Sequence, residues 1–268
     1  MNNYTKWYDL IKKHLSNYKI DKLQIEKNGI WKKNKKEYSH ILPLECGNLN
    51  YMCPEAETAL SDEEKHSDWN HLNSSQTLCV NFFAPLKYLN DGRLLAVFLS
   101  YIVGKKTDIK ESCFEYVPKA YSSNFDFYVK DKEDGEYFFE IKYTENGVAK
   151  SGGGKNPFNA YCRYYCEDVK DNPSFKRVTK DAFMNKHYQA YRNMVKAKGN
   201  SYSIFITMKG NASTYEELQL AVKDLKCKKP ANLILLYWEE LIDVTIKLFN
   251  DNKELKEYYI KLKEKYII

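Results

Sequence analysis

The chain has 268 residues, of which 43% are hydrophobic and 15% aromatic, which excludes intrinsic disorder and allows one large α/β domain or two small ones. Lys and Arg total 42 against 36 Asp and Glu, so the net charge is +6; this mild excess fits a nucleic-acid partner, but it fits a solvated lysine-rich surface as well. No signal-peptide pattern opens the chain, and the longest apolar run, residues 94–103, is too short to span a bilayer, so we expect a cytoplasmic protein without a membrane partner.

The cysteines and histidines point to no metal centre of their own. Seven cysteines, an odd number, without an export signal argue against a disulfide framework. Neither Cys46 with Cys53 nor Cys162 with Cys166 has the C-x-x-C spacing, so a zinc or iron–sulfur site is the minor alternative to buried, reduced thiols. The five histidines lack metal-pair spacing, and we assign none of them a catalytic role.

The first half of the chain favours helices. Residues 4–18 predict an amphipathic helix, and residues 23–43 a hairpin or extended region that turns at Asn28-Gly29. The basic run KKNKK, residues 32–36, is either an exposed loop tip or a contact for phosphate. A helix opens near the serines at 74 and 75, Pro85 bends or ends it, and residues 94–103 form another helix.

The second half changes to strand periodicity. Residues 125–129 and 136–143 alternate with period two and predict strands; further strands are expected at 202–208 and 233–238, and helices at 180–198, 239–249 and 252–266. This order predicts an α/β fold with a central mixed sheet. We expect residues 1–70 to form a helical and extended region packed on a core of residues 71–268, the whole being one compact domain.

One pair of predicted strands carries a pattern with chemical meaning: Asp126 on the first strand, and Glu140-Ile141-Lys142 on the second. Other acid-x-Lys triplets occur in this lysine-rich chain, but only this one lies in an aromatic strand pattern that follows a strand with an acid. Residues two apart on a strand share a face, so Glu140 and Lys142 point the same way, together with Phe138 and Thr144.

The hairpin loop decides whether Asp126 joins that face. A two-residue loop, Asp134-Gly135, would place Asp126 opposite Tyr143 on the wrong face. A three-residue loop of residues 133–135, or an equivalent bulge, places Asp126 opposite Lys142 and diagonal to Glu140. We predict the three-residue loop.

These residue types suit phosphodiester hydrolysis. Two carboxylates are hard oxygen ligands for Mg²⁺, for which Mn²⁺ can substitute, and a bound metal polarises a phosphoryl oxygen and activates water. A neighbouring lysine can orient that water or stabilise charge on the phosphate. An ordinary hairpin with a surface Glu–Lys pair explains the spacing about as well.

The arrangement of Asp126 and Glu140-Ile141-Lys142 resembles the signature of the PD-(D/E)XK nuclease superfamily, although Phe125 stands where that family often has Pro. The resemblance implies a restriction-endonuclease-like core with a central mixed β-sheet flanked by helices. It implies that Asp126 and Glu140 bind the metal and that Lys142 assists the attacking water.

Further segments within about residues 70–241 are similar to a bacterial branch of restriction-endonuclease-like proteins. They are His71-Leu-Asn-Ser-Ser-Gln76, Asn81-Phe82-Phe83, Glu115-Tyr116, Glu140-Ile-Lys-Tyr-Thr-Glu145, Tyr188-Gln189 with Arg192-Asn193, and Tyr237-Trp-Glu-Glu-Leu241.

The resemblance suggests supporting residues. Glu115 is expected as a further catalytic and metal-binding carboxylate, against the alternative of a solvated glutamate, and Gln189 as a helix residue that assists the site. Gln189, Arg192, Asn193 and Lys196 share one face of the predicted helix, which is either a DNA-facing stripe that includes Arg192 and Lys196 or an ordinary solvent face.

The segment Ser151-Gly-Gly-Gly-Lys155 lacks the pattern of a P-loop, and we expect a mobile loop that brings Lys150 and Lys155 near nucleic acid, or else a plain flexible connection.

The expected activity is a Mg²⁺-dependent deoxyribonuclease, a restriction-type or phage-defence endonuclease. The resemblance implies a homodimer as the common assembly, and a defence-system partner protein remains open. The alternatives are an exonuclease or junction resolvase of the same fold, or a non-catalytic nucleic-acid-binding subunit of a defence complex.

Overall fold

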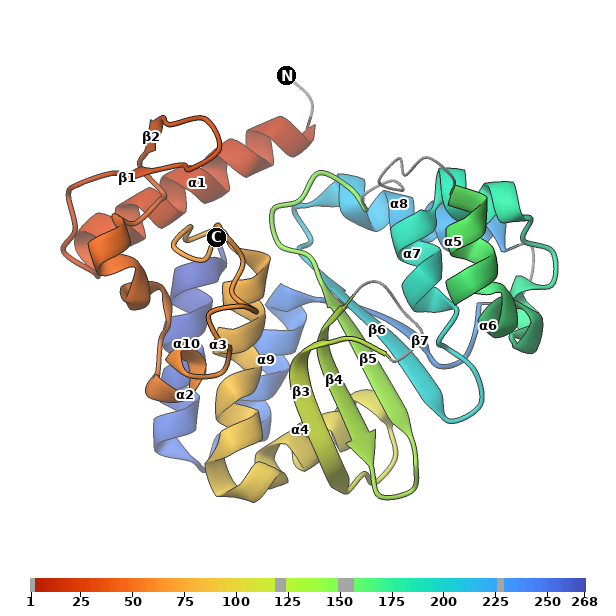
Figure 1. Ribbon diagram of the computed structural model, residues 1–268. Coiled ribbons are helices and arrows are strands. Elements are labelled where there is room, and N and C mark those ends of the chain that lie inside the picture. Colours follow the sequence, from red (N-terminus) through yellow and green to blue (C-terminus); the bar gives the residue numbers. More distant parts are fainter. Residues whose placement is uncertain (1–2, 119–123, 149–156, 226–228) are drawn as a thin grey trace. The chain divides into compact units, whose positions relative to one another are not determined.

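The computed structural model describes residues 3–118, 124–148, 157–225 and 229–268 (Figure 1). The chain divides into two compact units: unit 1 comprises Met1–Ile109 and Tyr237–Ile268, and unit 2 comprises Lys110–Leu236. This division differs from the expected boundary at residue 70, because the helices that follow residue 74 pack with the C-terminal helices in unit 1.

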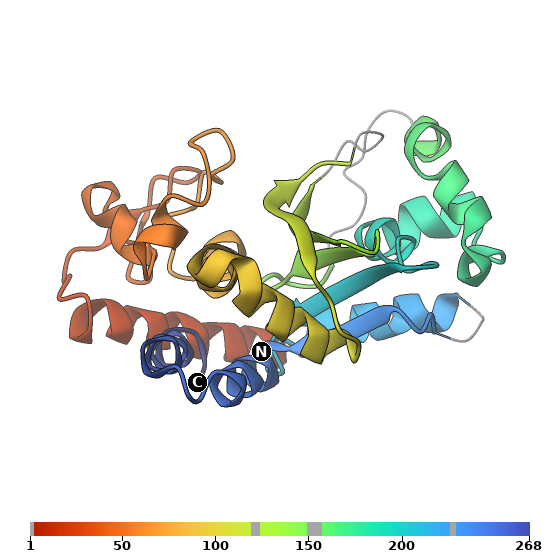
Figure 2. The ribbon, with the colours of Figure 1, turned by 90° about the horizontal axis from the view of Figure 1, so that it is seen from below.

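Unit 1 is mainly helical. Its helices are α1 (Asn3–Asp21), α2 (Pro54–Glu57), α3 (Ser75–Tyr88), α4 (Arg93–Val103), α9 (Trp238–Leu248) and α10 (Lys253–Tyr266), with 3₁₀ turns at Leu44–Asn50 and Leu89–Gly92. Helix α10 contacts α1, α3 and α9, and both ribbon views show it beside α3 and α9 (Figures 1 and 2). Phe82 of α3 packs edge-on against Trp238 and Tyr259, with ring centroids 5.1 and 5.3 Å away, so the core of unit 1 joins early and late parts of the chain.

Most expected helices of unit 1 are confirmed. Ser74 caps α3, since its side chain accepts a hydrogen bond from the Thr77 amide at 3.3 Å. Pro85 lies inside α3 and does not end it. A hairpin of β1 (Gly29–Ile30) and β2 (Glu37–Tyr38) turns through residues 31–36 rather than at Asn28-Gly29.

Unit 2 is built on a five-stranded sheet. The strands are β3 (Ile109–Tyr116), β4 (Phe125–Asp131), β5 (Glu136–Ile141), β6 (Ser201–Thr207) and β7 (Leu233–Tyr237), in the spatial order β3-β4-β5-β6-β7. β5 pairs antiparallel with β4 and parallel with β6, which confirms the α/β class with a central mixed sheet flanked by helices.

Helices cover the sheet of unit 2. They are α5 (Pro157–Tyr164), α6 (Cys166–Asp171), α7 (Tyr188–Met194) and α8 (Ala212–Asp224). Phe205 of β6 belongs to a buried cluster with Tyr191 of α7 and Leu218 of α8. Because Phe205 is the register partner of Glu140, these helices lie on the face of the sheet that carries Glu140.

The β4–β5 loop differs in detail from the prediction. It has three residues, but they are 132–134 rather than 133–135, because Asp131 pairs with Gly135 through a 2.9 Å backbone hydrogen bond. The buried Asp131 carboxylate accepts hydrogen bonds from the Glu133 and Gly135 amides at 2.9 and 2.7 Å, which fixes this turn. Asp134, with a φ of 59°, occupies the left-handed position of this turn.

The consequence is a register in which Lys130 pairs with Glu136 and Phe127 with Phe139. Continued by one residue, this register sets Asp126 across from Glu140, and not across from Lys142 as predicted. The shift is by an even number of residues, so Asp126 keeps the expected face.

Other elements depart further from expectation. The helix expected over residues 180–198 is broken into a π-helical turn, Ala182–Lys186, and the short α7, with His187 between them outside helical backbone angles. The pattern did not predict β3, α5, α6 or α8. Within the described ranges, no helix is long and apolar enough to cross a membrane.

Candidate active site

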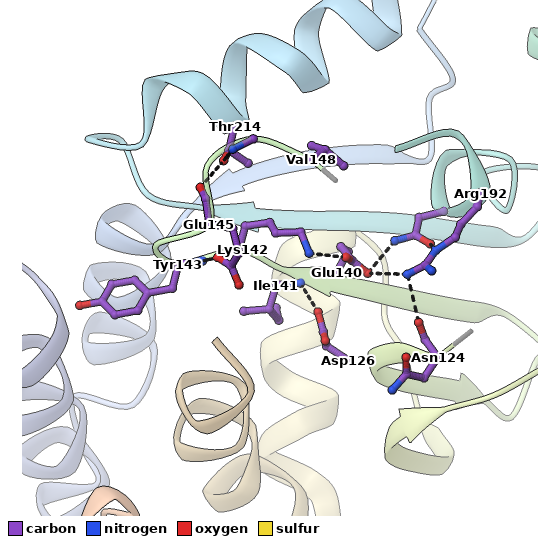
Figure 3. Close-up of polar contacts among 12 residues, drawn as sticks. Asn124, Asp126, Glu140, Ile141, Lys142, Tyr143, Glu145, Val148, Arg192 and Thr214 are labelled. Atoms are coloured by element: carbon purple, nitrogen blue, oxygen red, sulfur yellow. Dashed lines mark hydrogen bonds and ion pairs between the residues drawn. The ribbon is translucent and has the colours of Figure 1, made fainter. Parts of the chain in front are cut away.

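Two neighbouring strands of unit 2 bring the predicted residues together. β4 supplies Asp126, and β5 and the residue after it supply Glu140 and Lys142 (Figure 3). The Lys142 Nζ donates a 2.6 Å hydrogen bond to Glu140 Oε1, and the backbone amide of Lys142 donates to the Ile206 carbonyl at 2.9 Å. The sheet therefore holds the backbone of Lys142 while its ammonium group meets the carboxylate two residues earlier.

Asp126 joins this pair through the backbone of β5. Its Oδ2 accepts a 2.6 Å hydrogen bond from the Ile141 amide (Figure 3). Burial, and next the negative charge of Glu140, raise the pKa of Asp126 well above its usual range, while the charge of Lys142 partly offsets them. Two carboxylates thus share a buried site in which both cannot be ionised without cost.

The charges of the other two groups are fixed by their neighbours. Burial alone would raise the pKa of Glu140, but the charges of Lys142 and Arg192 and the hydrogen bonds from Lys142 and Asn193 lower it. Burial would lower the pKa of Lys142, but the charges of Glu140, Glu145 and Asp126 outweigh burial and raise it. Lys142 is therefore held as an ammonium ion among carboxylates.

Helix α7 contributes two contacts that the sequence did not reveal. Asn193, 1% exposed, donates a 2.6 Å hydrogen bond from Nδ2 to Glu140 Oε2. Arg192 donates from Nε to Asn193 Oδ1 at 3.1 Å, and its Nη2 lies 3.8 Å from Glu140 Oε2 and 3.4 Å from the Asn124 carbonyl (Figure 3). The two oxygens of Glu140 thus have different partners: Oε1 accepts from Lys142, and Oε2 accepts from Asn193 of α7.

Glu115 lies close enough to act electrostatically on the site. Its negative charge is among the causes that raise the pKa of Asp126. Its carboxylate accepts a hydrogen bond from the Asn124 side-chain amide. Its φ of 49° falls in the left-handed region, which costs a non-glycine residue about 1–2 kcal/mol. Such local strain is typical of functional positions.

The remaining predicted residues are placed less favourably. Arg192 and Lys196 do not form the expected exposed stripe, because Arg192 is buried against Asn193 and Lys196 donates to Asp168 at 2.8 Å with a side chain only 15% exposed. Gln189 is partly exposed and lies one turn before Asn193 on α7. Lys150 and Lys155 fall outside the described residues.

The chain after Lys142 is tied down by α8. Asn211, at the start of that helix, donates to the Tyr143 and Glu145 carbonyls at 3.2 and 2.7 Å, and the Thr214 hydroxyl donates to the Glu145 carbonyl at 3.0 Å. The Glu145 carboxylate folds back to accept from the Tyr143 amide at 2.6 Å (Figure 3). Glu145 is thereby fixed near Lys142.

The donor set suits a hard divalent cation better than a soft one. No group of three or more His, Cys, Asp or Glu side chains able to hold a metal occurs among the described residues, and the cysteines described there are free. What the site offers is the oxygen pair of Asp126 and Glu140, and a divalent cation would relieve the repulsion that raises the pKa of Asp126. Ions such as Mg²⁺, which keep several waters, need few protein ligands.

The chain matches the model of a known protein family. A family model described as restriction endonuclease associating with ARP matches residues 12–267. No curated protein and no solved structure matches the chain.

Proposed function

The chain belongs to the family of restriction endonucleases associating with ARP, and on this basis we propose that it is a metal-dependent nuclease that hydrolyses phosphodiester bonds of DNA. The observation that carries the proposal is Lys142, an ammonium group held 2.6 Å from Glu140 in a buried site that also contains Asp126. A purely structural ion pair would not require a second, repelling carboxylate beside it.

In this proposal Asp126 and Glu140 hold Mg²⁺, or Mn²⁺ in its place, and Glu115 supports them. When bound, the cation supplies the positive charge that polarises the phosphodiester and eases deprotonation of water. Lys142 orients the attacking water and stabilises the negative charge that develops on the phosphate. Asn193 and Arg192 keep Glu140 in one orientation, and Gln189 lies one helical turn before Asn193, where it can assist the substrate.

The biological setting also belongs to the proposal. The family description supports a restriction or defence role in which the chain acts together with the protein named ARP. A homodimer would allow two sites to cut the two strands of a duplex.

The test is cleavage of supercoiled and linear DNA in Mg²⁺ or Mn²⁺ by the wild type and by Lys142→Ala. Loss of nicking in the variant is the expected result, and the fragment pattern separates site-specific from end-dependent cutting. Lys110→Ala is the matched control, since Lys110 also follows an acid at the same spacing (Asp108) but is exposed on β3. Circular dichroism and a melting curve show that each variant is folded.

A thermal shift with Mg²⁺ or Mn²⁺ separates binding from chemistry. We expect stabilisation of the wild type and of Lys142→Ala, and none of Asp126→Asn or Glu140→Gln. Cleavage that survives in Lys142→Ala, or a folded wild type that neither binds metal nor cuts DNA or RNA, would refute the proposal.

A further inference from the structure

The β1–β2 hairpin of unit 1 carries a dense positive charge. Four of the five residues at 32–36 are lysines, and all five residues are exposed. Lys33 has a carboxylate within 4 Å, that of Asp68 at 3.8 Å; among the described residues Lys32, Lys35 and Lys36 have none. Like charges this close together repel one another, and a bound anion would relieve that repulsion.

The loop is ordered by its own hydrogen bonds. Trp31 and Lys36 close it, since the Trp31 amide donates to the Lys36 carbonyl at 2.9 Å, and the Lys35 amide donates to the Trp31 carbonyl at the same distance. Asn34 accepts from the Lys36 amide at 3.1 Å and donates to the Tyr38 hydroxyl at 2.7 Å. The lysines therefore project from a fixed frame, which lowers the entropy lost when they meet a ligand.

Aromatic rings support the base of the loop. Trp31 stands edge-on to Tyr38 and His71, with centroids 5.9 and 6.1 Å away, and donates from Nε1 to Asp68 at 3.3 Å. Lys33 Nζ lies 5.7 Å from the Trp31 ring centroid. Both Trp31 and Tyr38 are partly exposed, so flat apolar surface adjoins the cations.

We propose that this loop, residues 31–36, is a nucleic-acid-binding surface whose lysines contact consecutive backbone phosphates. The partner follows from charge complementarity: a nucleic acid is an extended polyanion with about one charge per 1.7 Å of duplex, and lysine binds phosphate without reading sequence. The loop belongs to unit 1, whereas Asp126 and Glu140 belong to unit 2. The proposed surface therefore rests on the proposed function only in the choice of nucleic acid as the ligand.

The test is binding of a short fluorescent DNA duplex in Ca²⁺ or EDTA, measured by anisotropy between about 50 and 200 mM salt. The hairpin variant replaces Lys32, Lys33, Lys35 and Lys36 by Gln. A helix variant, with Lys247, Lys253, Lys256 and Lys261 replaced by Gln on α9 and α10, changes the net charge equally at a different place. We expect the hairpin variant to bind DNA about tenfold or more weakly, with a salt slope that is shallower by about 0.9 for each phosphate that its side chains no longer neutralise.

The outcomes separate this inference from the proposed nuclease. Weaker binding by the hairpin variant together with normal binding by the helix variant supports the proposed surface. The same result, obtained with proteins that also carry Lys142→Ala, supports the surface whether or not cleavage depends on Lys142. Equal binding by the hairpin variant and wild type overturns the surface and leaves the nuclease intact. The proposed surface is also overturned if the wild type binds no nucleic acid. It is overturned as well if the hairpin variant keeps its binding to DNA and loses only its binding to anionic phosphatidylserine vesicles.

Discussion

The carboxylate of Glu140 is positioned by hydrogen bonds from two parts of the chain. Its Oε1 accepts from Lys142, two residues later in the chain, and its Oε2 accepts from Asn193 of α7 at 2.6 Å. The strand contact could be predicted, since residues two apart share a face. The Asn193 contact could not, because it depends on how α7 packs against β5 and no local pattern encodes that packing.

We therefore predict that Asn193→Ala weakens the site without abolishing it. Glu140 Oε2 would lose a buried donor, at a cost of about 1–3 kcal/mol in the free energy of unfolding. The metal concentration for half-maximal thermal shift should rise about tenfold or more, as is typical when a group that orients a ligand is removed. Asn193→Asp should be worse than Asn193→Ala, because it places a second carboxylate against Glu140.

Asn185→Ala is the control, since Asn185 is exposed and its side-chain amide donates to the neighbouring Asp181. Equal metal affinity in Asn193→Ala, Asn185→Ala and the wild type would show that Asn193 does not position Glu140.

At the scale of elements, the β4–β5 hairpin determines where Asp126 lies. The alternation of aromatic residues predicted both strands and the shared face of Asp126 and Glu140. The alternation did not predict the register. The Asp131 carboxylate accepts hydrogen bonds from the Glu133 and Gly135 amides, and the turn therefore closes one residue earlier in the chain than predicted. A side-chain-to-backbone hydrogen bond of this kind competes with the loop residues that turn statistics favour.

Gly135 is expected to be essential to this turn although its φ is not positive. A Cβ at Gly135 would lie 2.5 Å from Asp131 Oδ2. Gly135→Ala should lower the free energy of unfolding by about 1–3 kcal/mol, as overpacking at a buried position does. Lys132→Ala, in the exposed part of the same loop, should change it by less than about 0.5 kcal/mol. Urea unfolding measures both, and equal midpoints would contradict this account of the turn.

The sequence patterns of the elements that were not predicted were either weak or were not recognised. β3 is half-exposed along most of its length, so its sequence lacks the alternation that marks a strand. α8 did carry a signal: Asn211 accepts from the Thr214 amide as an N-cap, and the buried residues Thr214, Leu218 and Ala221 recur at helical spacing.

At the scale of the whole molecule, stability should depend on pH through Lys265. This lysine is fully buried in unit 1, donates to the Asn50 carbonyl at 2.5 Å and to Asn50 Oδ1 at 2.9 Å, and burial lowers its pKa to about 7. Above pH 7 the folded protein releases this proton, whereas the unfolded chain keeps it until near pH 10.4. Stability should therefore rise with pH across that window, by up to about 1.4 kcal/mol per pH unit.

The check is the difference in unfolding free energy between the wild type and Lys265→Met, measured by urea titration from about pH 6 to 9. The variant loses two hydrogen bonds, which shifts its curve by a constant, but the rise above pH 7 should be missing. A difference that does not change with pH would mean that Lys265 keeps its proton in the folded protein throughout this range.

The division of the chain into units has a consequence for biosynthesis. A ribosome releases Met1–Ile109 first, but the aromatic partners of Phe82, which are Trp238 and Tyr259, are made only after all of unit 2. The core of the nascent N-terminal segment therefore stays incomplete until these residues are synthesised. Its exposed apolar surface is meanwhile a target for chaperones or for aggregation. Unit 2 can bury its own cluster as soon as β7 emerges, so we expect unit 1 to complete its core after unit 2.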